Sequence, residues 1–200
     1  MKKSIIFILC AFLFMACKDN PAVKKAKEAK DNVVNTKNAL QESRNMQDDI
    51  KDLSETTPLT NEELKTWLPD NLDGMKRTSY KAGAMGMMNI SSLEATYEAE
   101  DNSRKFKIEV IDGAGEMGAM ATAGMRMALS QDFEEESETK MRRSTTKNGN
   151  KAVEEVDKRR SISTVQYMHQ KRFYIQATGT NMDLEEVWDL LDEMDVEDLE

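Results

Sequence analysis

Apolar residues recur at every second position in several stretches after residue 90, which is the spacing of a half-buried β-strand. The stretches 93–99 and 106–110 alternate in this way, and the polar residues 101–103 between them predict a turn. A second hairpin is predicted over 145–156, because Asn148-Gly149 favours the positive φ angles of a two-residue turn. Both hairpins indicate antiparallel pairing.

Further strands are expected after the turn Leu72-Asp73-Gly74, at about 161–168 and at 172–178. The last two are joined by the polar turn His169-Gln170-Lys171, which predicts that His169 lies at the surface. Connections this short join antiparallel neighbours, whereas parallel strands need a crossover of a dozen residues or more. The whole pattern predicts an antiparallel sheet of about six to seven strands.

Helical spacing appears in three segments of the same region. Thr60 and Glu63 form a capping box that predicts a short helix over 61–67, ended by Pro69. Asp183 and Glu186 form a second capping box, before a C-terminal helix with one apolar face. That face consists of Leu184, Val187, Leu191 and Met194. With a Met/Ala/Gly-rich helix between the hairpins, the fold class is α+β, in which a central helix and a C-terminal helix pack on the sheet.

A long N-terminal tether helix is expected before this domain, because 22–57 contains neither Gly nor Pro. Its apolar residues are sparse: Ala26, Ala29, Val33, Leu40, Ile50 and Leu53. Three interpretations stay open, namely a solvated tether, a helix docked on its own domain, and an oligomerisation helix. The sequence leaves the oligomeric state open.

The first residues have the form of a signal peptide. Lys2 and Lys3 precede an apolar run over 5–16 that is too short to span a bilayer as a mature helix. Leu13-Phe14-Met15-Ala16-Cys17 resembles the lipobox of bacterial lipoproteins. The resemblance implies cleavage between Ala16 and Cys17 and lipidation of Cys17, which would anchor the protein stably in a membrane. The alternative is an ordinary secretory signal with an incidental cysteine.

The residues after Cys17 bear on which membrane holds the anchor. Lys18 stands where lipoproteins retained in the inner membrane carry Asp, so the resemblance implies the outer membrane of the cell envelope. Lys18-Asp19 is also similar to short export tags of Bacteroidota surface lipoproteins. Periplasmic and surface exposure both stay open. The expected organisation is a signal peptide at 1–16, a lipidated N-terminus with a polar tether at 17–57, and a single α+β domain at 58–200.

Composition and charge exclude several classes of function. The net charge of the chain is −9, and 183–200 is rich in acidic residues with no Lys or Arg, so neither nucleic acid nor anionic lipid headgroups are expected partners. Lipidation of Cys17 would leave no free thiol for a disulfide, a nucleophile or a zinc site. One histidine and no GxSxG motif provide no recognisable triad. We therefore expect no enzyme, no catalytic residue, no metal and no cofactor.

The segment 110–127, VIDGAGEMGAMATAGMRM, allows three interpretations. Gly113, Gly115 and Gly118 spell the GxGxxG of dinucleotide-binding turns, but the parallel βαβ unit that this motif needs is missing. Paired methionines could hold Cu(I), although no Cys or second His accompanies them. Helical spacing favours a third interpretation, in which one face packs on the sheet while Arg126 points away. That face consists of Met117, Met120, Ala121, Gly124, Met127 and Ala128, with Gly124 allowing a close approach.

Several packing motifs of 59–195 resemble a family of small bacterial envelope domains without assigned activity. They are Leu68-Pro69, Leu72-Asp73-Gly74, the strand from Ser91 to Tyr97, and the Gly-Ala-Met helix. The resemblance implies a fold and no site. The expected function is that of a non-catalytic, lipid-anchored envelope protein with a binding or structural role toward another envelope protein. The alternative is a carrier or sensor of a small apolar ligand or soft metal, held between the Met-rich helix and the sheet by Met117, Met120 and Met127.

Overall fold

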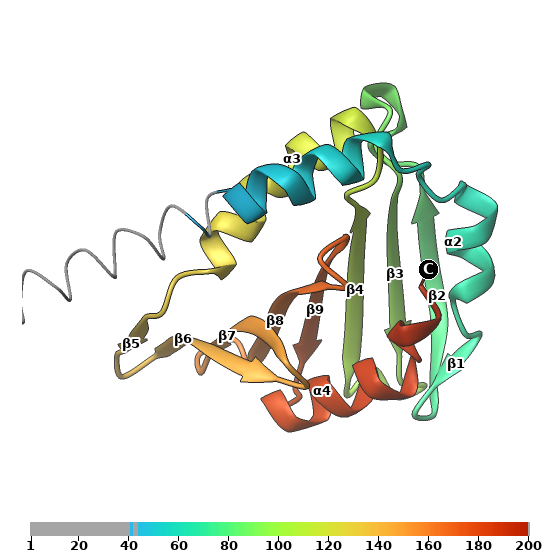
Figure 1. Cartoon of the computed structure of the whole chain (residues 1–200). Helices are drawn as coiled ribbons and strands as arrows, with labels where there is room; N and C mark the ends of the chain where they lie inside the picture. Colours follow the sequence, from blue (N-terminus) through green and yellow to red (C-terminus); the bar gives the residue numbers. More distant parts are fainter. Residues whose placement is uncertain (1–40, 42–43, 200) are drawn as a thin grey trace, which may run out of the picture. The chain divides into compact units, whose positions relative to one another are not determined.

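The computed structural model describes residue 41 and residues 44–199 (Figure 1). Ala16, Cys17 and most of the predicted tether lie outside the described residues. A compact unit is formed by Asp48–Glu200, and the following description concerns this unit. In the described residues, no helix combines the length and the apolar character needed to cross a bilayer.

One antiparallel sheet of nine strands, in the order β1-β2-β3-β4-β9-β8-β7-β6-β5, forms the centre of the unit (Figure 1). The first four strands are β1 (Asn71–Leu72), β2 (Met75–Ala82), β3 (Ser92–Glu98) and β4 (Lys105–Asp112). The others are β5 (Glu134–Glu136), β6 (Lys140–Lys147), β7 (Asn150–Asp157), β8 (Ile162–His169) and β9 (Phe173–Thr180). Every neighbouring pair follows the chain except β4 and β9, which pair over their whole length and join the two halves of the sheet.

The helices are α2 (Asn61–Trp67), α3 (Gly115–Leu129) and α4 (Leu184–Glu193), with 3₁₀ turns η1 (Gly86–Met88) and η2 (Val196–Asp198). Residues 48–55 are also helical. Both predicted capping boxes are present, at Thr60 with Glu63 before α2 and at Asp183 with Glu186 before α4. The α+β class and the antiparallel sheet are therefore confirmed.

The predicted number of strands, six to seven, is too low. The short strands β1 and β5 at the two edges of the sheet were not predicted. β1 has only two residues, and β5 consists of Glu134, Glu135 and Glu136, all exposed. With two residues, β1 is too short to show alternation, although its Leu72 is buried in the core. β5 shows none because its three glutamates bury no face, and charge at an edge also discourages pairing with other chains.

The main core lies on one face of the sheet, beneath α2, α4 and η2. The inward residues of the central strands are fully buried, among them Phe106, Ile108 and Val110 of β4 and Phe173 and Ile175 of β9. Leu64 of α2, Val187 and Leu191 of α4, and Leu199 after η2 complete this core. The opposite face is polar along the middle of the sheet, where Gln166 Nε2 donates to Gln176 Oε1 at 2.8 Å.

His169 is buried, with 3% of its surface exposed, so the prediction of a surface position is wrong. It is the last residue of β8 and points to the core face, paired with Phe173 across the β8–β9 hairpin. The turn itself is made by residues 170–172, of which Gln170 and Lys171 have positive φ. The prediction failed because polar residues follow His169 in the sequence, although His169 continues the inward alternation of Val165 and Tyr167.

Candidate functional site

Two glycines, Gly113 and Gly115, turn the chain from β4 into α3. Gly115 has φ +76°, a backbone conformation that other residues rarely adopt. A Cβ on Gly113 would lie 2.6 Å from the carbonyl oxygen of Arg172, so only glycine fits beside that backbone. These two residues set the angle at which α3 leaves the sheet.

The buried face of α3 consists of Gly118, Ala119, Thr122, Arg126 and Leu129. Their spacing keeps them on one side of the helix, which contacts β4, β7 and β8. A Cβ on Gly118 would lie 2.6 Å from the carbonyl oxygen of Asp112 and 3.0 Å from the carbonyl carbon of Gly113. The helix therefore approaches the chain most closely at Gly118.

The methionine face that was predicted to pack on the sheet is the exposed one. Met117, Met120 and Met127 are 41%, 63% and 61% exposed, and a Cβ on Gly124 would meet nothing within 4 Å. Arg126, which was predicted to point away, is buried instead. Both faces of this helix have apolar residues at helical spacing, and the backbone contact at Gly118 selects the face that carries this glycine.

This result also moves the predicted ligand-binding residues. Met117, Met120 and Met127 do not lie between α3 and the sheet. The prediction that they hold a ligand or soft metal in that position is therefore wrong. Binding of a ligand by these three residues stays a prediction, and it would take place on the outer side of the helix. Within residues 44–199, no group of three or more His, Cys, Asp or Glu side chains is arranged to hold a metal ion.

We call the exposed residues Met117, Met120, Gly124, Met127 and Ala128 the outer α3 face. The five residues of this face carry no charge in a chain that is 32% charged, but the exposed Glu116 of the first turn of α3, four residues before Met120, lies beside them. Apolar surface of this kind marks sites of interaction. Methionine is common on binding surfaces because its flexible thioether adapts to different partners.

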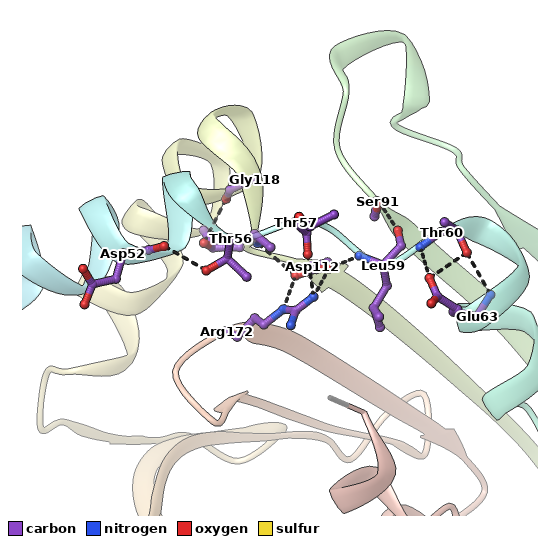
Figure 2. Close-up of polar contacts among 12 residues, drawn as sticks. Asp52, Thr56, Thr57, Leu59, Thr60, Glu63, Ser91, Asp112, Gly118 and Arg172 are labelled. Atoms are coloured by element: carbon purple, nitrogen blue, oxygen red, sulfur yellow. Dashed lines mark hydrogen bonds and ion pairs between the residues drawn. The ribbon is translucent and has the colours of Figure 1, made fainter.

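Asp112, at the end of β4, organises the polar contacts beside the start of α3 (Figure 2). Its fully buried carboxylate accepts hydrogen bonds from the backbone N–H groups of Leu59 (2.8 Å) and Ala114 (2.9 Å). Arg172 donates two more, from Nε at 2.8 Å and from Nη2 at 2.9 Å. With these four bonds, the acceptor positions of the carboxylate are filled. This arrangement suits a structural role rather than acid–base chemistry.

The same contacts fasten the segment between the N-terminal helix and α2. Arg172 Nη2 also donates to the carbonyl oxygen of Thr57 at 3.4 Å (Figure 2). The N–H of Gly115 donates to the carbonyl oxygen of Thr56 at 3.0 Å. Sequence reasoning missed Asp112. The available signal was its position, because it continues the inward alternation of β4 and so places a carboxylate where an apolar residue is expected.

The helix over 48–55 docks on the unit beside α3 (Figure 1). Leu53 is buried, and Lys171 Nζ forms an ion pair with Asp49 Oδ2 at 3.2 Å. Of the three interpretations of the tether, docking on the chain's own domain therefore holds for these residues. The rest of the tether lies outside the described residues.

Arg126 is the least satisfied buried group of this region. Its Nη2 donates to Thr122 Oγ1 at 2.6 Å, while Nε and Nη1 have no partner among the described residues. Burial lowers the pKa of the guanidinium, and the carboxylate of Asp49 partly offsets that effect. The residue carries a desolvated charge behind the outer α3 face.

No family model matches the chain, and neither a curated protein nor a solved structure matches it.

Proposed function

We propose that this protein is a non-catalytic, lipid-anchored protein of the cell envelope, held in the outer membrane through Cys17, that binds another envelope protein through the outer α3 face. One observation carries the binding part: α3 exposes three methionines on one helix face, whose charge is limited to Glu116 at its N-terminal end. The anchoring part rests on Ala16-Cys17 after the apolar run of the signal-peptide-like segment.

The chemistry of the outer α3 face indicates the kind of partner. Met117, Met120 and Met127 offer apolar contact area, and Gly124 leaves open space between them for a second backbone. A helix with an uncharged, apolar face fits such a surface, because small residues let two helices approach closely while larger side chains fill the flanks. Apart from Glu116 at the N-terminal end of the helix, this face offers no charged group, so a charged partner surface would lose hydration there without gaining ion pairs.

The local structure keeps this face in a fixed position. Asp112 and Arg172 hold the start of α3 to the ends of β4 and β9, and Gly118 sits against the chain behind the helix. A face held rigidly before binding loses less conformational entropy when the partner docks. The chain also enters the unit beside α3, through the docked helix over 48–55.

Anchoring is tested by Cys17→Ser. The variant should leave the membrane fraction and lose palmitate labelling, while unchanged membrane association would contradict the anchor.

Binding is tested in the lipidated protein by Met120→Glu, which puts a charge on the outer α3 face. Met87→Glu is the matched control, because Met87 is a fully exposed methionine outside α3. A partner that co-purifies with the parent should be lost with Met120→Glu and kept with Met87→Glu. Equal recovery with both variants would contradict the proposed surface.

A further inference from the structure

A cavity of about 210 Å³ opens on the core side of the sheet, and no residue of α3 is among the described residues that line it. It lies where the ends of β7 and β8 meet α4 and η2, and its buried floor includes Tyr167, His169 and Trp188. Drug-sized ligands occupy cavities of roughly 300–1,000 Å³. This one is therefore suited to a smaller molecule.

His169 lines this cavity and carries an unpartnered polar atom. The side chain is 97% buried, since 3% is exposed, and its Nε2 has no hydrogen-bond partner among the described residues. Its ring stacks on Phe173, with the ring centroids 6.4 Å apart and an interplanar angle of 27°. Buried polar atoms are almost always hydrogen-bonded, so an unpartnered one beside a cavity indicates a missing partner.

The floor also presents two aromatic rings in a fixed arrangement. The rings of Tyr167 and Trp188 lie 5.5 Å apart, and the indole N–H of Trp188 donates to Glu154 Oε1 at 2.9 Å. That bond fixes the orientation of the indole. Lys147 Nζ lies 5.6 Å from the centroid of this ring, so a bound cation would take the place of this ammonium group or use the rest of the aromatic surface.

The rim of the cavity is acidic. Asp192, Asp195 and Glu197 line it, and Lys147 is the only positively charged residue among the described residues that line the cavity. Burial raises the pKa of Tyr167, and the carboxylates of Asp192 and Glu197 raise it further, which places these two charges near the phenol. The cavity therefore has a negative potential over an aromatic floor.

We propose that this cavity binds a small organic cation, a protonated or quaternary amine, between the aromatic floor and the acidic rim. Aromatic faces together with carboxylates are the environment that recognises ammonium groups. His169 would supply a hydrogen bond to the same molecule. The site is separate from the outer α3 face, so the inference goes beyond the proposed function.

The test is isothermal titration of the full-length protein, purified in detergent, with putrescine and with choline. Acetate and glycine serve as anionic and zwitterionic comparisons. We expect saturable binding of at least one of the two amines, weakened at least tenfold by Asp192→Asn combined with Glu197→Gln. Both residues are exposed, so the charge is removed without disturbing the core. Asp198→Asn removes one charge from the same turn outside the cavity and should leave the affinity unchanged.

His169→Gln provides a second readout, because it alters the unpartnered group and leaves the rim intact. It should weaken amine binding while the melting temperature shows that the variant is folded. Absence of saturable binding by both amines in the parent would overturn the proposal. So would equal binding of acetate, or an affinity that Asp192→Asn with Glu197→Gln leaves unchanged.

Discussion

Asp112 and Arg172 form a bidentate ion pair, with Nε 2.8 Å from Oδ1 and Nη2 2.9 Å from Oδ2. The carboxylate comes from the end of β4 and the guanidinium from the residue before β9, so the pair ties the two central strands together where α3 begins. Because the carboxylate is fully buried, its charge depends on this partner and on two backbone N–H groups.

Replacing Asp112 with Asn should destabilise the protein by about 3 kcal/mol, because it leaves the charge of Arg172 without its partner. The measurement is urea unfolding monitored by circular dichroism. Asp198→Asn makes the same chemical change at an exposed position and should alter the free energy of unfolding by less than about 0.5 kcal/mol. Similar unfolding midpoints for the two variants would contradict the structural role of Asp112.

Two glycines of α3 should respond to alanine in opposite directions. Gly118→Ala places a Cβ 2.6 Å from a backbone oxygen, so the helix must shift, at a cost of about 1–3 kcal/mol. Gly124→Ala meets nothing within 4 Å and should stabilise the protein by about 0.5–1 kcal/mol, because alanine restricts the unfolded chain. Thermal unfolding of both variants decides the matter. Destabilisation by Gly124→Ala would mean that the face of α3 that carries Gly124 is buried.

Arg126→Met should stabilise the protein by about 1–3 kcal/mol, since methionine fills similar space without leaving two buried nitrogens unpaired. The hydrogen bond of Thr122 to the carbonyl of Gly118 does not depend on Arg126 and should persist. The measurement is the melting temperature, with Arg159→Met as an exposed control. A fall in melting temperature for Arg126→Met would show that the guanidinium has a partner that compensates for its burial.

Burial lowers the pKa of His169 below its ordinary value of 6.5, and Glu197 partly offsets this. The unfolded chain therefore takes up the proton first as the pH falls, so the contribution of His169 to stability is complete above pH 6.5 and decreases below it. Unfolding free energies of the parent and of His169→Gln, measured from pH 7.5 to 5, should show the parent losing stability relative to the variant. A constant difference across this range would contradict the burial of His169.

Most strands could be predicted because their outward residues meet water. The alternation over 93–99 and 106–110 marks β3 and β4, and Asn148-Gly149 marks the turn between β6 and β7. The capping boxes gave the starts of α2 and α4, since capping depends on residues close in sequence. These signals depend on residues close in sequence, and for that reason they predict the local structure correctly.

The orientation of α3 could not be predicted in the same way. Its two faces have similar apolar spacing, and the choice between them depends on how closely Gly118 approaches residues 112 and 113. That contact is made by backbone atoms, and it therefore produces no periodic pattern of side chains in the sequence. Asp112 was missed for a related reason, because its partner Arg172 lies 60 residues away. Neither relationship can be read from neighbouring residues.

Site-specific photo-crosslinking at Met120 tests the proposed function most directly. A benzoylphenylalanine at this position, in the lipidated protein within intact cells, lies at the centre of the outer α3 face. We predict a discrete crosslinked product with one envelope protein from Met120, which disappears when Met127→Glu is added. The same probe at Met87 should give no such product. Absence of a product from Met120, or the same product from Met87, would contradict the assignment of the outer α3 face as the binding surface.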